Sequence, residues 1–107
     1  APLQLLPPRI APAAETVAKR TQPWAAFFVP LVVDHDPKDP RPPDLPVSLV
    51  IDWGDGTIET TTPQPAGQAV QRAYTYRSGG VMRVRAQSRD AWGNASDWSS
   101  VVAVTVV

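Results

Sequence analysis

Proline divides this chain into two halves with different folding options. All thirteen prolines lie at or before Pro65, and all six glycines lie at or after Gly54. A proline fixes φ and lacks a backbone donor, so this density argues against helices in the first half. The glycines of the second half stand in short polar segments between apolar runs, where they mark turns. No useful length of sequence shows the 3.6-residue period of a helix, so we predict an all-β protein.

Composition narrows the classes of function. A chain of 107 residues is one domain, and it has one histidine and no cysteine, which excludes a disulfide scaffold, a thiolate zinc site and a multi-histidine metal site. The formal net charge of zero argues against nucleic acid as a partner, because phosphate binding needs a basic excess. No apolar run approaches the ~20 residues of a membrane span, and the first residues lack the pattern of a signal peptide. We therefore expect neither segment in this chain.

From residue 24 onward, short apolar runs alternate with turn signals. Residues 24–33 (WAAFFVPLVV) form a continuous apolar run that predicts a strand buried on both faces or bulged, and Pro30 indicates an edge position or a bulge there. Further strands are predicted over residues 47–53, 57–62, about 70–76, 81–89 and 98–107. Within 81–89, apolar residues alternate with Arg and Gln, which predicts one buried and one wet face. The pattern indicates an antiparallel β-sandwich of about seven strands over residues 24–107.

Residues 1–23 have a different character, with five prolines among apolar side chains. We predict an extended, Pro-rich N-terminal arm or an edge segment for this part of the chain. As an arm, it would lie along a partner through Leu3, Leu5, Leu6 and Ile10. As an edge strand, it would place the same side chains against the sandwich.

The stretch IDWGDGT, from Ile51 to Thr57, resembles the W-D-F-G-D-G-T signature of the polycystic kidney disease (PKD) family of immunoglobulin-like domains. The resemblance continues downstream, where Tyr76 is followed four residues later by Gly80 and then by alternating apolar positions. It covers about residues 47–107. The sequence departs from the family where one aromatic residue is missing beside Trp53, where Met82 replaces a common Tyr, and where Ser88 replaces a common Val.

The resemblance implies a single immunoglobulin-like antiparallel β-sandwich. The tail after residue 84 also resembles the end of fibronectin type III domains, which share that architecture. Asp side chains accept hydrogen bonds from nearby backbone N–H groups and so hold a turn, while paired carboxylates can also do acid–base chemistry or bind a cation. The resemblance favours the first role, because the family's motif is a turn and not a site. We therefore assign a structural role to Asp52, Trp53, Gly54, Asp55, Gly56, Thr57 and Tyr76. We further predict that Trp53 is a core residue.

Two groups of residues are candidates for contact with a partner. Arg83, Arg85 and Arg89 share one face of a predicted strand, and Arg72 and Arg77 are nearby in the sequence. This group of five arginines would pair with Glu59 and other acids across the sheet, dock on an acidic protein surface, or meet nucleic acid. Trp92 precedes a turn glycine. It would pack over the end of the sandwich, or it would contact a partner such as a protein or the face of a sugar ring.

The loop over residues 34–46 carries the weakest candidate site. Asp34, Asp36 and Asp39 supply oxygen ligands of the kind that Ca²⁺ takes, although their spacing is not that of an EF-hand. A solvated loop is the alternative, and we expect no other cofactor. His35 has no recognisable nucleophile as a partner, so we predict no catalytic residue.

These observations favour a non-enzymatic structural or interaction module. We expect a decoration or accessory protein, in many copies, on a larger assembly such as a phage virion (capsid or tail) or a cell-surface structure. The alternative is a polysaccharide- or protein-binding accessory domain of a secreted hydrolase, a setting that the PKD resemblance implies.

Overall fold

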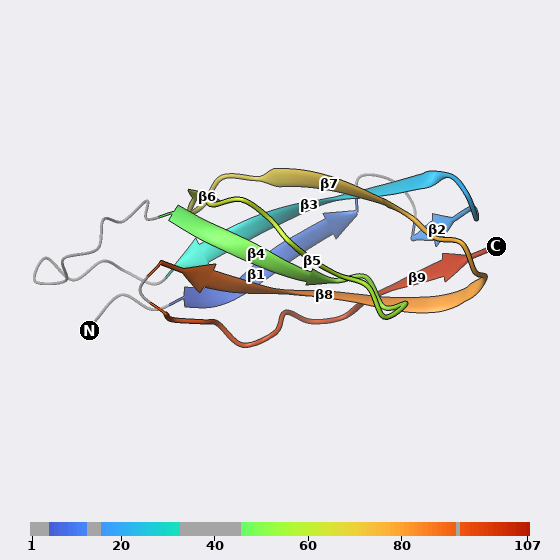
Figure 1. Cartoon of the computed structure of the whole chain (residues 1–107). Coiled ribbons are helices and arrows are strands. Elements are labelled where there is room, and N and C mark those ends of the chain that lie inside the picture. The colour runs from blue at the N-terminus through green and yellow to red at the C-terminus, as the bar shows by residue number, and fades with distance from the viewer. Residues whose placement is uncertain (1–4, 13–15, 33–45, 92) are drawn as a thin grey trace, which may run out of the picture.

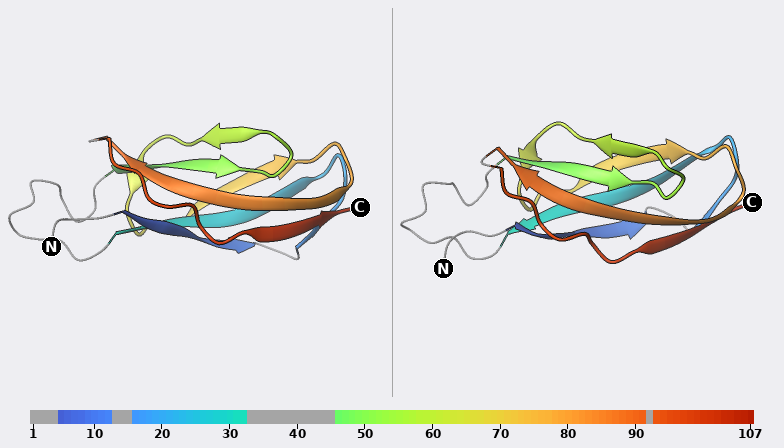
Figure 2. Two further views of the ribbon diagram at one scale, coloured as in Figure 1. Left: turned by 90° about the horizontal axis from the view of Figure 1, so that it is seen from below. Right: turned by 60° about the horizontal axis from the view of Figure 1, so that its bottom comes forward.

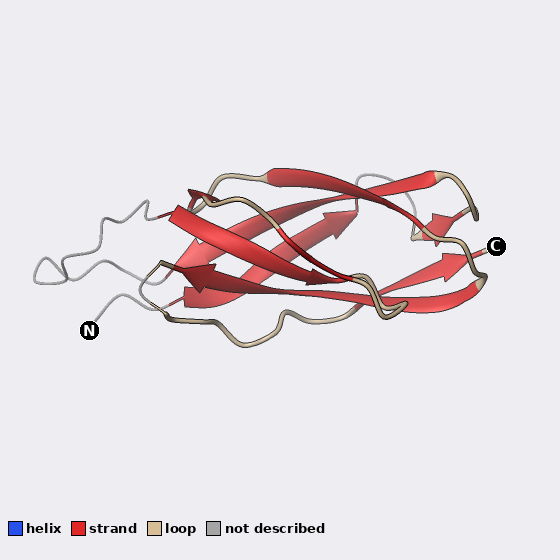
Figure 3. Cartoon of the chain, viewed as in Figure 1, coloured by secondary structure: helices blue, strands red, loops and turns tan. Residues whose placement is uncertain are grey.

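The structure, a computed structural model, describes residues 5–12, 16–32, 46–91 and 93–107. These residues contain strands and loops and no helix (Figure 3). The strands, labelled in Figure 1, are β1 (Leu5–Pro12), β2 (Val17–Ala18), β3 (Pro23–Val32), β4 (Pro46–Asp52), β5 (Ile58–Thr60), β6 (Gln64–Pro65), β7 (Val70–Thr75), β8 (Gly80–Asp90) and β9 (Val102–Val106).

The strands form two sheets that pack face to face (Figure 2). The smaller sheet has the order β1-β3-β7. The larger sheet has the order β2-β9-β8-β4-β5, and β6 also pairs with β4. Every pairing is antiparallel except that of β2 with β9. The predicted immunoglobulin-like β-sandwich is therefore confirmed.

Alternation along β8 separates the core from solvent, as the sequence predicts. Met82, Val84, Ala86 and Ser88 are buried, while the residues between them are exposed or half-buried. The buried row of β4 faces the same interior through Val47, Leu49 and Ile51.

The core is centred on Trp53, whose side chain is fully buried as predicted. Its ring meets Trp24 edge-on at a centroid distance of 6.4 Å and Phe28 at 5.9 Å, so it joins the larger sheet to β3 of the smaller one. Edge-to-face contacts of this kind add to the free energy of burying the rings. This packing fixes the position of the turn that follows β4.

Pro30 lies in the middle strand of the smaller sheet, so the predicted edge position is wrong. The other predicted alternative, a bulge, is present in the ladder at Pro30, and its extra residue lies on the neighbouring strand β1. The register between β1 and β3 shifts between Leu6 and Arg9, which places Pro7 and Pro8 opposite Pro30. None of the three prolines has an N–H to donate, so the hydrogen-bond ladder is interrupted at one point and continues on both sides.

The described part of the first 23 residues belongs to the sandwich. β1 forms an edge of the smaller sheet, and β2 pairs in parallel with β9 of the larger sheet. The division of the chain into an N-terminal segment and a sandwich at residue 23 stays a prediction.

The last strand begins later than residue 98, the start predicted from its Val-rich sequence. Before β9, two serines bind β8 partly through their side chains. Ser96 Oγ accepts a hydrogen bond from Ser88 N, and Ser99 Oγ accepts one from Ala86 N, each at 3.0 Å. Because hydroxyl groups occupy donors that a regular ladder would use, this segment is irregular although it follows β8.

Candidate functional site

The predicted turn motif is held by its own carboxylates. Asp52 Oδ1 accepts a hydrogen bond from Gly54 N at 2.9 Å, and Asp55 Oδ1 accepts one from Thr57 N at 3.0 Å. Trp53 N donates to Thr57 O at 3.1 Å and closes the turn. These contacts follow from the sequence, because Asp side chains bond to backbone donors two residues ahead.

The two glycines of the turn have different surroundings. Both have positive φ, 87° at Gly54 and 93° at Gly56, a region that side chains with a Cβ disfavour. A Cβ at Gly54 would lie 2.5 Å from Arg83 N, whereas a Cβ at Gly56 would meet nothing within 4 Å. The turn therefore rests directly on the backbone of β8 at Gly54.

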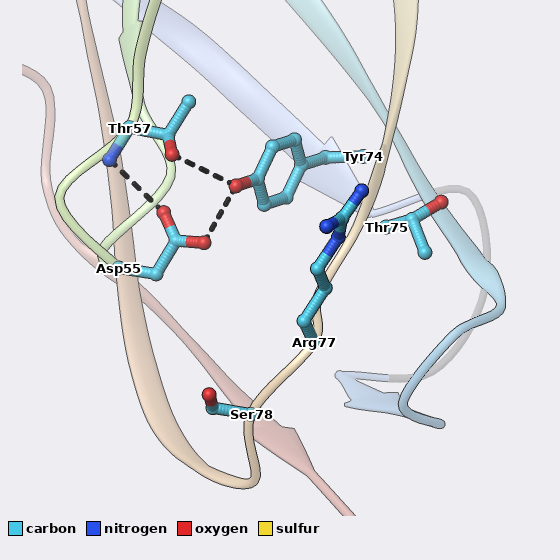
Figure 4. Close-up of a pocket in the computed structure, with 6 residues that line it drawn as sticks. All are labelled: Asp55, Thr57, Tyr74, Thr75, Arg77 and Ser78. Carbon is cyan, nitrogen blue, oxygen red and sulfur yellow. Dashed lines mark hydrogen bonds between the residues drawn. The ribbon is translucent and has the colours of Figure 1, made fainter.

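Tyr74 on β7 connects the turn to the smaller sheet. Its Oη lies 2.5 Å from Asp55 Oδ2 and 2.9 Å from Thr57 Oγ1 (Figure 4). Because a phenol has one proton, Tyr74 donates to the carboxylate and accepts from the Thr57 hydroxyl. Burial acts to raise the pKa of Asp55, but the hydrogen bonds from Tyr74 and Thr57 outweigh it and hold that pKa below its usual value. The bond to Asp55 raises the pKa of Tyr74.

A polar hollow of about 430 Å³ opens beside these three residues. Figure 4 shows its lining, which consists of Asp55, Thr57, Tyr74, Thr75, Arg77 and Ser78. The Asp55 carboxylate already accepts hydrogen bonds at both oxygens, and its lowered pKa makes it a weaker base. This geometry supports a structural role for Asp55, Thr57 and Tyr74 and does not favour acid–base chemistry in the hollow.

Tyr76 connects the turn to the core. Its buried hydroxyl donates to Trp53 O at 2.7 Å, and burial raises the pKa of this phenol. Trp53 Nε1 donates to Glu59 Oε1 at 3.3 Å, and Arg72 Nε donates to Glu59 Oε2 at 2.6 Å. Since Arg72 is on β7 and Glu59 is on β5, this ion pair joins the two sheets at one side of the sandwich.

The arginines of β8 have different partners. Arg85 lies between Asp52, at 3.3 Å from Nε to Oδ2, and the ring of Trp98, whose centroid is 4.2 Å from the guanidinium carbon. Arg89 Nε donates to Gln87 Oε1 at 3.3 Å. Arg83 is exposed and lines a second hollow beside the turn. Two arginines of the predicted group therefore pair within the molecule, Arg72 with Glu59 and Arg85 with Asp52.

Sequence reasoning did not predict the contacts of Tyr74 with the turn motif or of Trp98 with Arg85. Tyr74 stands two residues before Tyr76 and stacks on Trp53 at 4.9 Å between centroids. Their spacing is a signal of a shared strand face. Trp98 has no such signal, because its contact with Arg85 depends on the irregular segment before β9.

Two apolar candidates of the N-terminal segment, Leu5 and Ile10, pack against the sandwich, whereas Leu6 lies opposite Leu31 in the ladder with β3. Leu5, Leu6 and Ile10 are half-buried in β1; Ile10 packs on the main core and Leu5 on Val47. The other candidates lie outside the described residues. They are Leu3, Trp92 and the calcium candidates Asp34, Asp36 and Asp39.

Two features are absent from the described ranges. No three side chains of His, Cys, Asp or Glu gather in them to hold a metal ion. Nor do these ranges contain a helix with the length and apolarity to cross a membrane.

A solved structure shares this arrangement of strands over almost the whole chain. It is the PKD domain of an M14-like peptidase from Thermoplasmatales archaeon SCGC AB-540-F20, with a TM-score of 0.76 and 24% sequence identity. The match covers 95% of this chain and 94% of that one. This chain has the fold of a PKD domain. The resemblance carried by IDWGDGT is thus confirmed at the level of the fold.

Sequence comparison adds nothing to this PKD-like fold, since no family model and no curated protein matches the chain. The matched PKD domain is one part of a peptidase.

Proposed function

We propose that this PKD-like domain is a non-enzymatic interaction module that docks as a decoration or accessory protein on a larger assembly. The assembly would be a phage virion, at its capsid or tail, or a cell-surface structure. One observation carries the proposal: the carboxylates of the turn motif are engaged in holding the fold. Asp52 binds Gly54 and Arg85, Asp55 binds Thr57 and Tyr74, and Glu59 binds Trp53 and Arg72.

The first test is sedimentation of a lysate from the native source through a density gradient, with this protein followed by antibody. We expect it to migrate with a particle of megadalton size. The separately expressed chain, run on a parallel gradient, gives the position of the free protein. Migration of the native protein at that position alone would contradict the proposal.

An enzymatic role has its own test. Asp55→Asn and Asp52→Asn variants would be compared with the unchanged protein in hydrolase assays on peptide, ester and glycoside substrates. We expect no turnover by any of the three proteins. Activity that disappears in a folded Asp55→Asn variant would overturn the non-enzymatic assignment.

The peptidase context of the known neighbour favours a second candidate. In this alternative, the domain is an accessory module of a secreted hydrolase and binds polysaccharide or protein. Co-sedimentation with insoluble polysaccharides and with collagen fibres tests it directly. A Trp92→Ala variant probes the aromatic candidate from the sequence, and a Trp98→Ala variant is the matched control from the same half of the chain.

A further inference from the structure

The smaller sheet turns an apolar row away from the core. In β3, Trp24, Ala26, Phe28 and Pro30 are buried, so the alternate side chains lie on the outer face. Residues directly opposite in the ladder share that face, which adds neighbours from β1 and β7. We define the apolar face by its residues: Leu6, Ala11, Ala25, Phe27, Val29, Leu31 and Ala73.

The apolar face is open at its centre. Phe27 is 37% exposed, although it lies in the middle strand between Ala11 of β1 and Gln71 of β7. Ala11 and Ala73 are exposed as well. Polar side chains stand only on the two outer strands, where Arg9, Gln71 and Thr75 border the face.

The outer face of the larger sheet has the opposite character. Its central strand β8 alternates as a half-solvated antiparallel strand should, with Arg83, Arg85, Gln87 and Arg89 facing out. β3 occupies the central position of its own sheet and shows no polar residue between Pro23 and Val32. The apolar face is therefore not a general property of this sandwich but belongs to one side of it.

Charge adds a second constraint on what covers the apolar face. The smaller sheet contains no acidic residue, because the carboxylates of the described residues lie elsewhere, in β4, the turn after it, β5, the end of β8 and the loop before β9. Arg72 is engaged by Glu59. Arg9 is exposed opposite Val29 and pairs with no described carboxylate. A partner with a carboxylate beside its apolar surface would complement Arg9.

The size of the face argues against a second copy as its occupant. Three strands about 4.8 Å apart and eight residues long, at about 3.3 Å each, cover roughly 380 Å². A stable dimer needs about 800 Å² from each partner. Contacts between neighbouring domains are smaller, about 300–750 Å² a side, so this face fits a partner that is also held by other contacts.

We propose that the apolar face of β1, β3 and β7 docks on a protein that presents an apolar surface with a carboxylate at its rim, opposite Arg9. The proposal rests on the proposed function, since it names the surface through which the module joins its assembly. Thr75 borders this face and also lines the polar hollow, whereas the hydrogen bonds among Asp55, Thr57 and Tyr74 lie on the other face of β7.

Photo-crosslinking in the native source tests the surface. Benzoylphenylalanine is placed at position 27 in one variant and at position 81 in the control, since Val81 is an exposed apolar residue of the larger sheet. We expect an adduct from position 27 and none from position 81. Mass spectrometry of the adduct should map the contact to an apolar segment that carries Asp or Glu.

The purified partner is then titrated with variants of this chain. Phe27→Lys should weaken binding about tenfold or more, because a charge would replace a central apolar contact. Arg9→Glu should also weaken binding, and it should be rescued when the partner's carboxylate is changed to Arg. Arg83→Glu on the larger sheet is the matched control and should leave the affinity unchanged. If Phe27→Lys does not fold, Ala73→Lys probes the same face from an edge strand.

The failures are distinguishable. An adduct between two copies of this chain through position 27 would overturn the assigned occupant. An adduct from position 81 alone, or equal adducts from both positions, would overturn the assigned face and leave docking itself intact. Native protein that sediments alone and forms no adduct would overturn the proposed function together with this inference.

Discussion

Two glycines of one turn offer a sharp test of the packing between the turn and β8. Gly54→Ala and Gly56→Ala make the same chemical change two residues apart, and both positions have positive φ. An alanine in this conformation costs about 1–2 kcal/mol at either position. Only Gly54 adds a steric term, because its new Cβ would lie 2.5 Å from Arg83 N and 2.8 Å from Arg83 O.

The steric term is set by how far β8 can move. Arg83 pairs with Ala103 of β9, and the ladder between β8 and β4 ends two residues away at Arg85, so the obstacle is strand backbone held on one side and anchored nearby on the other. Overpacking against such a neighbour costs about 1–3 kcal/mol. We therefore expect Gly54→Ala to lose about 2–5 kcal/mol of unfolding free energy in total, and Gly56→Ala about 1–2 kcal/mol.

Urea unfolding of both variants, followed by tryptophan fluorescence, measures the difference. The slope of the unfolding free energy against urea concentration should be the same for both variants, since both expose the same surface on unfolding. The expected difference in unfolding free energy between the two variants is about 1–3 kcal/mol. In a thermal melt, each kcal/mol of this difference should separate the two melting temperatures by roughly 4–8 °C. Equal losses at the two positions would refute the close approach of the turn to β8.

Four further perturbations probe the core and the site. Trp53→Ala should cost about 3–5 kcal/mol by leaving a cavity among Trp24, Phe28 and Tyr74, and an unchanged melting temperature would show that the core lies elsewhere. Ser88→Ala should leave the melting temperature equal or raise it, because the buried Ser88 hydroxyl has no hydrogen-bond partner among the described residues. The Asp55 carboxylate should stabilise the fold at pH values above its usual pKa of 3.8. This contribution should be lost as the pH falls through the lower pKa that Asp55 has in the folded protein. Tyr74→Phe should raise the pKa of Asp55 toward 3.8, as followed by NMR titration of the carboxylate, and an unchanged pKa would contradict the hydrogen bond.

Local signals account for most of the strands and for the turn. The alternation along β8 and the Asp–Gly pair after Trp53 depend on neighbours within a few residues, so a sequence displays them directly. The parts that sequence missed are nonlocal. The contact of Tyr74 with Asp55 crosses from one sheet to the other, and the contact of Gly54 with Arg83 depends on how the turn folds back on β8.

The late start of β9 shows where propensity misleads. The Val-rich tail predicts a strand from residue 98, yet Ser96 and Ser99 give their side-chain oxygens to donors of β8. Serine is small and polar enough to replace a backbone acceptor in this way, which a count of β-forming residues does not register. The same hydroxyls explain why this segment stays attached to β8 without a regular ladder.

The sequence of β3 predicts a strand that is buried on both faces or bulged, and the sandwich alone buries one face of β3. If the outward-facing residues of β3 stabilise the fold, replacing one of them should lower the unfolding free energy as much as replacing a buried residue of β3. Phe27 and Phe28 are adjacent, with 37% and 0% of their surface exposed. Phe28→Ala should cost about 3–5 kcal/mol. Phe27→Thr keeps β-propensity and removes apolar surface, so it should cost only about 1 kcal/mol in the isolated domain. If urea unfolding shows that Phe27→Thr and Phe28→Ala lose similar amounts of unfolding free energy, the outward-facing residues of β3 stabilise the fold. Docking on a partner would then no longer be needed to explain why these residues are apolar.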